Sequence, residues 1–368
     1  MLMNATSPLV GNECRNTTTI PITNDAVAAN WLYTETDKMI ITFLIPITIV
    51  VGVTGNLAFL FMVSRLKRMH NVTNIYLANI AVADIILVSY SPIVYVLSYF
   101  TSPIVHHMPV ENSAGCFIAF FLSNFGYTAS INIFTLVSFE RWLAICRPLQ
   151  HRRMTGERRT MKFVFAAWII AAVFSCLIAP KYGRSVRLCM DWPDSPQYDD
   201  LPRYLHTCRS IKHFETHPEI LDVLSFLLGL LFNGMFYVLI ILGLSNRPVL
   251  TDSSSPFDHQ STQIRNQVAR LLILTGTVFF ICNAPLRIAD LHGIIKNIFG
   301  VDILTKSQYD SIKIVGRACL FLNSSVNVFI YAFSSSFYRD GFRDALFCAS
   351  SQRRNQTSVS NSSMSSKI

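Results

Sequence analysis

Seven long apolar stretches, separated by short polar segments, dominate the pattern of the chain. Crossing about 30 Å of hydrocarbon takes about 20 mostly apolar residues, and lipid forbids unpaired backbone groups, so each stretch is expected to be a helix. The stretches run roughly from Met39 to Val63, Ile75 to Phe100, Ala114 to Phe139, Met161 to Pro180, Ile220 to Leu244, Leu271 to Ile294 and Tyr309 to Phe333. The pattern predicts an all-α membrane protein, a bundle of seven transmembrane helices.

An eighth stretch, Phe337 to Cys348, alternates aromatic and basic residues and is too short to span. It predicts a short amphipathic helix on the membrane surface. The expected organisation is an extracellular N-terminal segment (1–38), the bundle (39–336), the surface helix (337–348) and a cytoplasmic tail (349–368). The tail is rich in Ser and Thr with almost no apolar residues, so we expect it to be disordered.

Charge supports a membrane location and orients the chain. Charged residues make up 14% of the sequence, against about 25% in an average soluble domain. The excess of 31 Lys and Arg over 22 Asp and Glu lies in short loops beside apolar spans, which indicates orientation rather than nucleic-acid binding. The first and third loops carry Arg65, Lys67, Arg68, Arg147, Arg152, Arg153, Arg158 and Arg159. The positive-inside rule therefore predicts a multi-pass plasma-membrane protein with its N-terminus outside and its C-terminus in the cytoplasm.

Cysteines and sequons add detail to the outer side. Asn4-Ala-Thr and Asn16-Thr-Thr are glycosylation sequons in the outer segment. Cys14, Cys116, Cys189 and Cys208 also fall outside, where disulfides persist. A bridge from Cys116 to the loop after the fourth helix is expected. The sequence does not choose between Cys189 and Cys208 as its partner; we place Cys208 first, which leaves Cys14 with Cys189.

Asp84 is the only charge deep within the second apolar stretch. Polar groups inside a membrane bundle are costly and so are functional candidates. Helical spacing lets Asp84 face several oxygen-bearing side chains: Asn56, Ser130, Asn323, Ser324 and Asn327. We expect a sodium site of Asp84, Ser130, Asn323 and Asn327, and the alternative is a hydrogen-bonded polar core without an ion. No other cofactor is expected.

Landmarks in seven ordered helices resemble those of the rhodopsin-like G-protein-coupled receptors. They are Gly55-Asn56, Leu77-Ala-Asn-Ile-Ala-Val-Ala-Asp84, Cys116, Glu140-Arg141-Trp142, Arg147-Pro148-Leu149, Trp168, Tyr237, Cys282, Pro285 and Asn327 to Tyr331. The segment from Leu322 to Asn327 resembles the matching segment of neuropeptide receptors, including the FMRFamide-receptor-like and thyrotropin-releasing-hormone-receptor-like groups.

The resemblance implies a role in coupling for the motifs at the cytoplasmic side. Arg141, next to Glu140, would meet a heterotrimeric G protein when the sixth helix swings outward, while Pro148 and Leu149 would touch the same partner. Tyr237, Asn327 and Tyr331 would support the open form. A receptor kinase would phosphorylate the Ser- and Thr-rich tail, and arrestin would bind the added charge. Cys348, at the end of the surface helix, would be palmitoylated and so anchored in membrane lipid.

Three positions depart from the family pattern. Val328 stands where proline is usual in the seventh helix, Asn283 replaces the usual tryptophan in the sixth, and Gly229 stands where proline is common in the fifth. Proline removes a backbone hydrogen bond and kinks a helix, so Val328 predicts a straighter seventh helix. A receptor-like protein with weak or no G-protein coupling is therefore an alternative.

The outer half of the bundle carries the expected ligand site. Ser123 and Phe321 stand where amine receptors carry aspartate and opsins carry lysine, which argues against both classes. The expected polar mouth consists of Tyr95, Tyr99, Ser123, Asn124, Tyr127, Asn283, Arg287, Asp290 and Arg317. Arg287 and Asp290 can instead form an internal ion pair, which leaves Arg317 as the better contact for a carboxylate.

A charged mouth under a long second outer loop favours an extracellular peptide ligand, and the alternative is a small acidic or lipid ligand. Two other protein classes fit the sequence poorly. A transporter should show internal repeats or broken helices, and an enzyme should show a nucleophile with its base; neither pattern occurs in the spans. We therefore expect a receptor rather than an enzyme.

Overall fold

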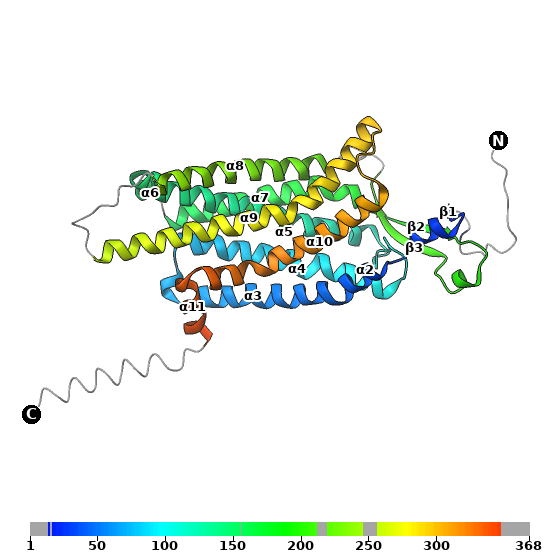
Figure 1. The fold of residues 1–368 in the computed structure, drawn as a ribbon, viewed down its shortest axis with the longest axis horizontal. Coiled ribbons are helices and arrows are strands. Elements are labelled where there is room, and N and C mark those ends of the chain that lie inside the picture. Colours follow the sequence, from blue (N-terminus) through cyan, green and yellow to red (C-terminus); the bar gives the residue numbers. More distant parts are fainter. Residues whose placement is uncertain (1–13, 15–16, 155, 212–218, 246–255, 347–368) are drawn as a thin grey trace, which may run out of the picture.

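The computed structural model describes residue 14 and residues 17–154, 156–211, 219–245 and 256–346. Within them, seven helical segments are long and apolar enough to cross a membrane: Glu35–Arg65, Val72–Thr101, Ser113–Cys146, Glu157–Tyr182, Ile220–Leu244, Ala269–Phe299 and Lys306–Ser334. The predicted seven-helix bundle is thereby confirmed (Figure 1). Large apolar side chains cover its outer faces, such as Phe43 at 67% and Phe165 at 67% exposure, as expected for surfaces that meet lipid.

The helical elements carry the labels of Figure 1. The first segment joins α2 (Glu35–Met39), η2 (Ile40–Leu44) and α3 (Ile45–Arg65), and η3 (Lys67–Met69) follows. The remaining spans are α4 (Val72–Thr101), α5 (Ser113–Cys146), α7 (Glu157–Ile178) with η4 (Ala179–Tyr182), α8 (Glu219–Ser245), α9 (Pro256–Phe299) and α10 (Lys306–Ser334). The short helices are α1 (Asp25–Ala29), α6 (Pro148–Met154), η5 (Pro196–Tyr198) and α11 (Ser336–Leu346).

Most spans extend beyond the apolar stretches that predicted them, because polar capping residues add turns at their ends. Asn71 caps α4 by accepting the backbone N–H of Asn74 at 3.0 Å. Thr305 begins α10 with a reciprocal capping box to Gln308. Such caps satisfy backbone donors that have no partner inside the helix, but hydropathy does not detect them.

A three-stranded sheet lies at one end of the bundle, and α11 lies at the opposite end (Figure 1). β1 (Thr18–Pro21) pairs in parallel with β2 (Arg184–Asp191), which pairs antiparallel with β3 (Tyr204–Arg209). An apolar cluster beneath the sheet contains Ile22, Ala28, Ile104, Leu188, Met190, Tyr198 and Leu205. The segment before the first span was expected only as a polar extension, and the structure instead folds its described part onto the outer loops.

Two disulfides secure the same end. Cys116 at the start of α5 is bonded to Cys208 in β3, with their Cα atoms 5.7 Å apart. It is the pairing placed first from the sequence. Cys14 is bonded to Cys189 in β2, with a Cα separation of 5.8 Å. The first bridge fixes the hairpin over the bundle, and the second ties the N-terminal strand to that hairpin.

The surface helix α11 packs beneath the bundle. It covers most of the predicted stretch, but it ends at Leu346, and Cys348 lies outside the described residues. Tyr338 donates a hydrogen bond to Asn74 Oδ1 of α4 at 2.8 Å, and Arg68 pairs with Asp344 at 2.7 Å. These contacts join α11 to η3 and to the start of α4.

The closest approach of α4 and α5 depends on Gly126. A Cβ atom built there would lie 2.9 Å from the Ala83 carbonyl oxygen and 3.0 Å from the Leu87 nitrogen, and backbone atoms cannot rotate away. Gly126→Ala should therefore lower the unfolding free energy by about 1–3 kcal/mol. Thermal unfolding of the purified protein in nanodiscs measures this change.

Gly234→Ala in α8 is the matched control, because no atom lies within 4 Å of its Cβ position. It should leave the melting temperature unchanged or slightly higher, since alanine favours a helix by about 1 kcal/mol over glycine. Equal melting temperatures for the two variants would contradict the assigned contact between α4 and α5.

Candidate functional site

Asp84 joins three helices in the middle of the bundle. It lies on α4 and is 1% exposed. Asn327 Nδ2 of α10 donates to one of its carboxylate oxygens at 2.7 Å, and Ser130 Oγ of α5 donates to the other at 3.4 Å. The structure thus brings together three of the four residues predicted for the sodium site.

Asn56 and Asn323, which were also expected near Asp84, form no hydrogen bond with it among the described residues. Asn56 Nδ2 donates to the backbone carbonyls of Gly52 and Ser324, at 2.8 and 3.0 Å, and so ties α3 to α10. Asn56 therefore does not contact Asp84 through a described hydrogen bond. Both amide atoms of Asn323 and the Oδ1 atom of Asn327 are buried without a hydrogen-bond partner.

The C-terminal end of α5 holds Glu140 and Arg141. Glu140 Oε1 lies 2.7 Å from His151 Nε2 of α6, so the acid contacts the short helix that follows α5. Arg141 is half-buried, forms no ion pair with an acid in the described part of the chain, and has a buried Nε without a partner. The sequence did not indicate the contact with His151, because the two residues lie on separate helices.

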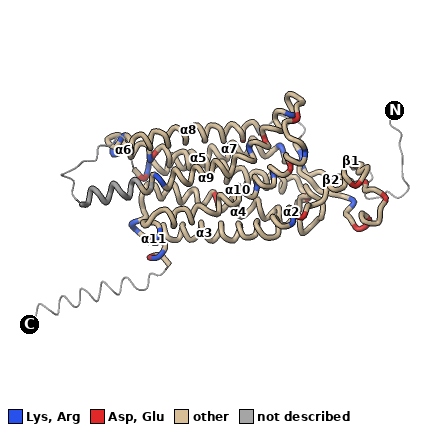
Figure 2. Tube along the Cα trace, in the orientation of Figure 1, with Lys and Arg blue, Asp and Glu red and all other residues tan. Residues whose placement is uncertain are grey.

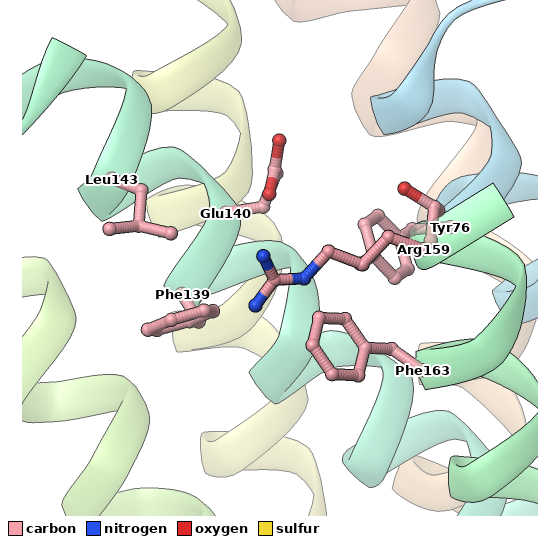
Figure 3. Close-up of a pocket in the computed structure, with 7 residues that line it drawn as sticks. Tyr76, Phe139, Glu140, Leu143, Arg159 and Phe163 are labelled. Carbon is pink, nitrogen blue, oxygen red and sulfur yellow. The ribbon is translucent and has the colours of Figure 1, made fainter. Parts of the chain in front are cut away.

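Figure 3 shows the surroundings of Glu140, where Arg159 extends toward it across the ring of Phe163. The Arg159 guanidinium lies 5.0 Å from that ring centre. The small cavity beside them measures about 10 Å³. That volume holds at most one water molecule, so this place is a packing contact and not a ligand site.

Tyr237 belongs to a polar network between α5, α8 and α9. Ser138 Oγ donates to Asn233 Oδ1 at 2.6 Å, and Asn233 Nδ2 donates to Thr135 Oγ1 at 2.8 Å. The Tyr237 hydroxyl donates to the Leu272 carbonyl of α9 at 3.4 Å. Asn233 was not singled out from the sequence, although an amide within an apolar span is the signal that identifies such residues.

The other predicted coupling residues occupy separate places. Tyr331 is 2% exposed, packs against Phe59 with ring centres 5.3 Å apart, and has a hydroxyl without a partner. Pro148 begins α6, and Leu149 beside it is 75% exposed. A large apolar side chain is therefore exposed at the end of the bundle opposite the sheet.

Arg287 is the centre of charge in the outer mouth. Its Nη1 atom lies 3.0 Å from Asp290 and 3.7 Å from Asp222 of α8. The internal pair considered from the sequence is therefore present, and Asp222 adds a second carboxylate. Asp222 was missed, although a charge inside the fifth apolar stretch was a visible signal.

Arg317 occupies another part of the mouth. Its guanidinium lies 4.6 Å from the ring centre of Tyr95, and no acid in the described ranges forms an ion pair with it. Lys313, one turn away on α10, lies 4.9 Å from the ring centre of Tyr309. These two cations make this side of the mouth positive.

The remaining predicted mouth residues contribute less directly. Ser123 and Asn124 donate hydrogen bonds to backbone carbonyls of their own helix, at 2.9 and 3.0 Å. Tyr99 packs edge to face on Tyr33, which lies before the first span, with ring centres 5.2 Å apart. Asn283 is fully buried and bonds only the Phe279 carbonyl, at 2.7 Å.

Several predictions concern residues outside the described ranges. The sequon residues Asn4 and Asn16, the palmitoylation candidate Cys348 and the tail 349–368 all lie there. Glycosylation, palmitoylation and the partnership of the tail with a receptor kinase and arrestin stay predictions.

Comparison with known proteins finds a matching family and several similar receptors. The family described as 7 transmembrane receptor (rhodopsin family) matches residues 55–331. The substance-P receptor of Mus musculus is 26% identical over 310 residues, which cover 82% of this chain and 69% of the relative. The somatostatin receptor type 2 of Mus musculus is 24% identical, with coverages of 85% and 79%. The neuromedin-U receptor 2 of Mus musculus is 26% identical, with coverages of 81% and 72%.

Proposed function

Because the chain belongs to the rhodopsin family of seven-transmembrane receptors, we propose that it is a cell-surface receptor that passes the binding of a peptide to a heterotrimeric G protein. The observation that carries this proposal is the family match through all seven spans, together with relatives named as receptors for substance P, somatostatin and neuromedin U. The multi-pass membrane location follows from the spans themselves.

The sheet end of the bundle faces the extracellular side in this proposal. Both disulfides lie there, and disulfides persist in oxidising compartments. Lys and Arg gather beside α6 and α11 at the other end, whereas acids also occupy the loops around β1 and β2 (Figure 2). This distribution supports a cytoplasmic position for α6 and α11 at the plasma membrane.

A peptide suits the outer mouth better than a lipid does. The mouth carries Arg287, Lys313 and Arg317 together with two carboxylates, and it lies beneath a hairpin that is itself bonded to the N-terminal strand. Charged, hydrogen-bonding walls match a ligand with many polar groups. Arg317 lacks an acidic partner in the described chain, so it is the contact for an acidic group of the ligand. A small organic acid is the second candidate, favoured by the same cation.

The cytoplasmic side supports coupling. Arg141 is not held by an acid among the described residues, and Leu149 presents an exposed apolar side chain beside it. Glu140 contacts α6 through His151, so that loop and the end of α5 form one surface. A ligand that binds better to an arrangement in which α9 leaves Arg141 open would shift the population toward the coupling form.

Asp84 and its neighbours fit a single small cation. Among described residues no group of three or more His, Cys, Asp or Glu could hold a metal, so a multiply charged ion is a poor match. One carboxylate with the unpartnered Oδ1 atoms of Asn323 and Asn327 instead suits sodium. Ser130 and Asn327 orient the carboxylate, and a bound sodium ion would balance its negative charge.

Arg141→Ala should abolish agonist-driven nucleotide exchange, because it removes the cation at the coupling surface. The measurement is nucleotide exchange in membranes, with the best agonist from a library of amidated and acid-ended peptides. Arg158→Ala, an exposed cation on α7, is the control and should exchange normally. Full exchange in Arg141→Ala at normal surface expression would contradict the assigned role.

Asp84→Asn should remove the effect of sodium on agonist affinity. In the wild type, sodium chloride should lower agonist affinity several-fold relative to choline chloride at equal ionic strength, a coupling of about 1 kcal/mol. The variant keeps a side chain of nearly the same shape and loses the charge. Competition binding in both salts measures the difference, and a sodium effect that survives in Asp84→Asn refutes the ion site.

Arg317→Gln should reduce the potency of acid-ended agonist peptides by about tenfold or more, because a charge-assisted hydrogen bond contributes about 1.5–3 kcal/mol. Lys306→Gln, an exposed cation at the start of α10, is the matched control and should leave potency unchanged. Dose–response curves for nucleotide exchange give both potencies. Unchanged potency in Arg317→Gln would remove this residue from the ligand site.

A further inference from the structure

Three residues of the outer mouth hold buried polar atoms that have no hydrogen-bond partner. They are Tyr127 Oη, Asn283 Oδ1 and Arg287 Nε, whereas Arg287 Nη1 forms the ion pair with Asp290 at 3.0 Å. Tyr127 is 3% exposed, Asn283 is 0% exposed, and the Arg287 side chain is 11% exposed. Leaving buried polar groups unpaired costs stability, so three such residues in one place indicate a site where a ligand supplies the missing partners.

The three residues face one another across α5 and α9. Phe279, Asn283 and Arg287 are one turn apart and occupy one face of α9. Phe279 stacks on the Tyr127 ring with centres 6.2 Å apart, and the Arg287 guanidinium lies 4.9 Å from the same ring centre. Asn283 lies between these two contacts, so it faces the same part of α5. Together Tyr127, Asn283 and Arg287 form what we call the mouth floor.

The free atoms of the mouth floor define what it can bind. Asn283 Nδ2 is already used by the Phe279 carbonyl, so only its acceptor Oδ1 is free. Arg287 can only donate, and the Tyr127 hydroxyl can do either. A matching ligand group must therefore offer a donor and an acceptor side by side, as the NH₂ and carbonyl of a primary carboxamide do.

Charge narrows the choice further. Arg287 already faces the carboxylates of Asp290 and Asp222, at 3.0 and 3.7 Å. A ligand carboxylate would add a third negative group and could not donate to Asn283. A ligand cation would repel Arg287 and leave its Nε donor unpaired. A neutral group meets neither obstacle.

We propose that the mouth floor binds a primary carboxamide of the ligand, its carbonyl accepting from Arg287 and its NH₂ donating to Asn283 Oδ1. The proposal rests on the proposed function and gives the ligand two anchors: an acidic group at Arg317 and a neutral amide deeper in the bundle. A C-terminal amide and an Asn or Gln side chain both supply that group.

Ligand-observed NMR on purified receptor tests the proposal with defined probes. N-acetyl-L-phenylalaninamide carries the terminal amide, and N-acetyl-L-phenylalanine is its acid counterpart. N-acetyl-L-glutamine methylamide and the matching glutamate compound test the side-chain source. The expected result is binding several-fold stronger for at least one amide than for its acid, and the stronger amide identifies the source. Equal binding within both pairs overturns the proposal.

Asn283→Leu is the decisive variant, and it should abolish the preference for the amide. Thr277→Val, an exposed position on α9, is the control and should keep that preference. The melting temperature of ligand-free Asn283→Leu should equal or exceed that of the wild type, because an unpaired buried oxygen is removed. A lower melting temperature with an unchanged amide preference would make Asn283 a structural residue and overturn the proposal.

The result is separable from the test of receptor function. A receptor that drives nucleotide exchange with peptide agonists, but treats amide and acid probes alike, would refute the carboxamide site only. Wild-type protein that prefers the amide probe, but drives no exchange with any peptide, would refute the proposed function and leave the site standing.

Discussion

Hydrocarbon cannot hydrogen-bond, so a polar group within the spans that finds no partner inside the bundle costs free energy. This constraint explains why Asp84 sits between Ser130 and Asn327, on three different helices. It also explains the hydrogen bonds that asparagine side chains donate from α3 to α10 and from α8 to α5. The helices are thereby held by directed contacts as well as by packing, and a change in one contact has consequences for its neighbours.

The long helix α9 connects the two functional ends of the molecule. Its outer half carries Asn283 and Arg287 in the mouth, while its inner half receives the Tyr237 hydroxyl at the Leu272 carbonyl. Pro285 lies inside the helix, where it removes a backbone hydrogen bond and permits bending. Arg287 and the carbonyl that accepts from Tyr237 therefore lie on the same helix.

The sequence predicted the parts of the fold that depend on composition along the chain. The seven spans and the surface helix follow from hydropathy, and Asp84 and Arg317 stand out as polar residues in apolar stretches. The contact of Glu140 with His151 and the pairing of β1 with β2 could not be predicted, because each joins residues far apart in sequence through tertiary packing. Asp222 was detectable from the sequence as a charge in an apolar stretch, whereas its pairing with Arg287 could be seen only in the structure.

The seventh helix, α10, is not the span in which bending is expected. α10 runs unbroken from Lys306 to Ser334, with buried Val328 where proline is usual in the family. A Cβ atom at Gly55 of α3 would lie 3.6 Å from Val328, so the two helices are already close there. A continuous α10 without this proline, hydrogen-bonded to Asp84 through Asn327, has fewer ways to bend than a proline-containing helix. Pro285 lies between Asn283 and Arg287 in the sequence, so α9, unlike α10, has a proline bending point within the part that carries the mouth floor.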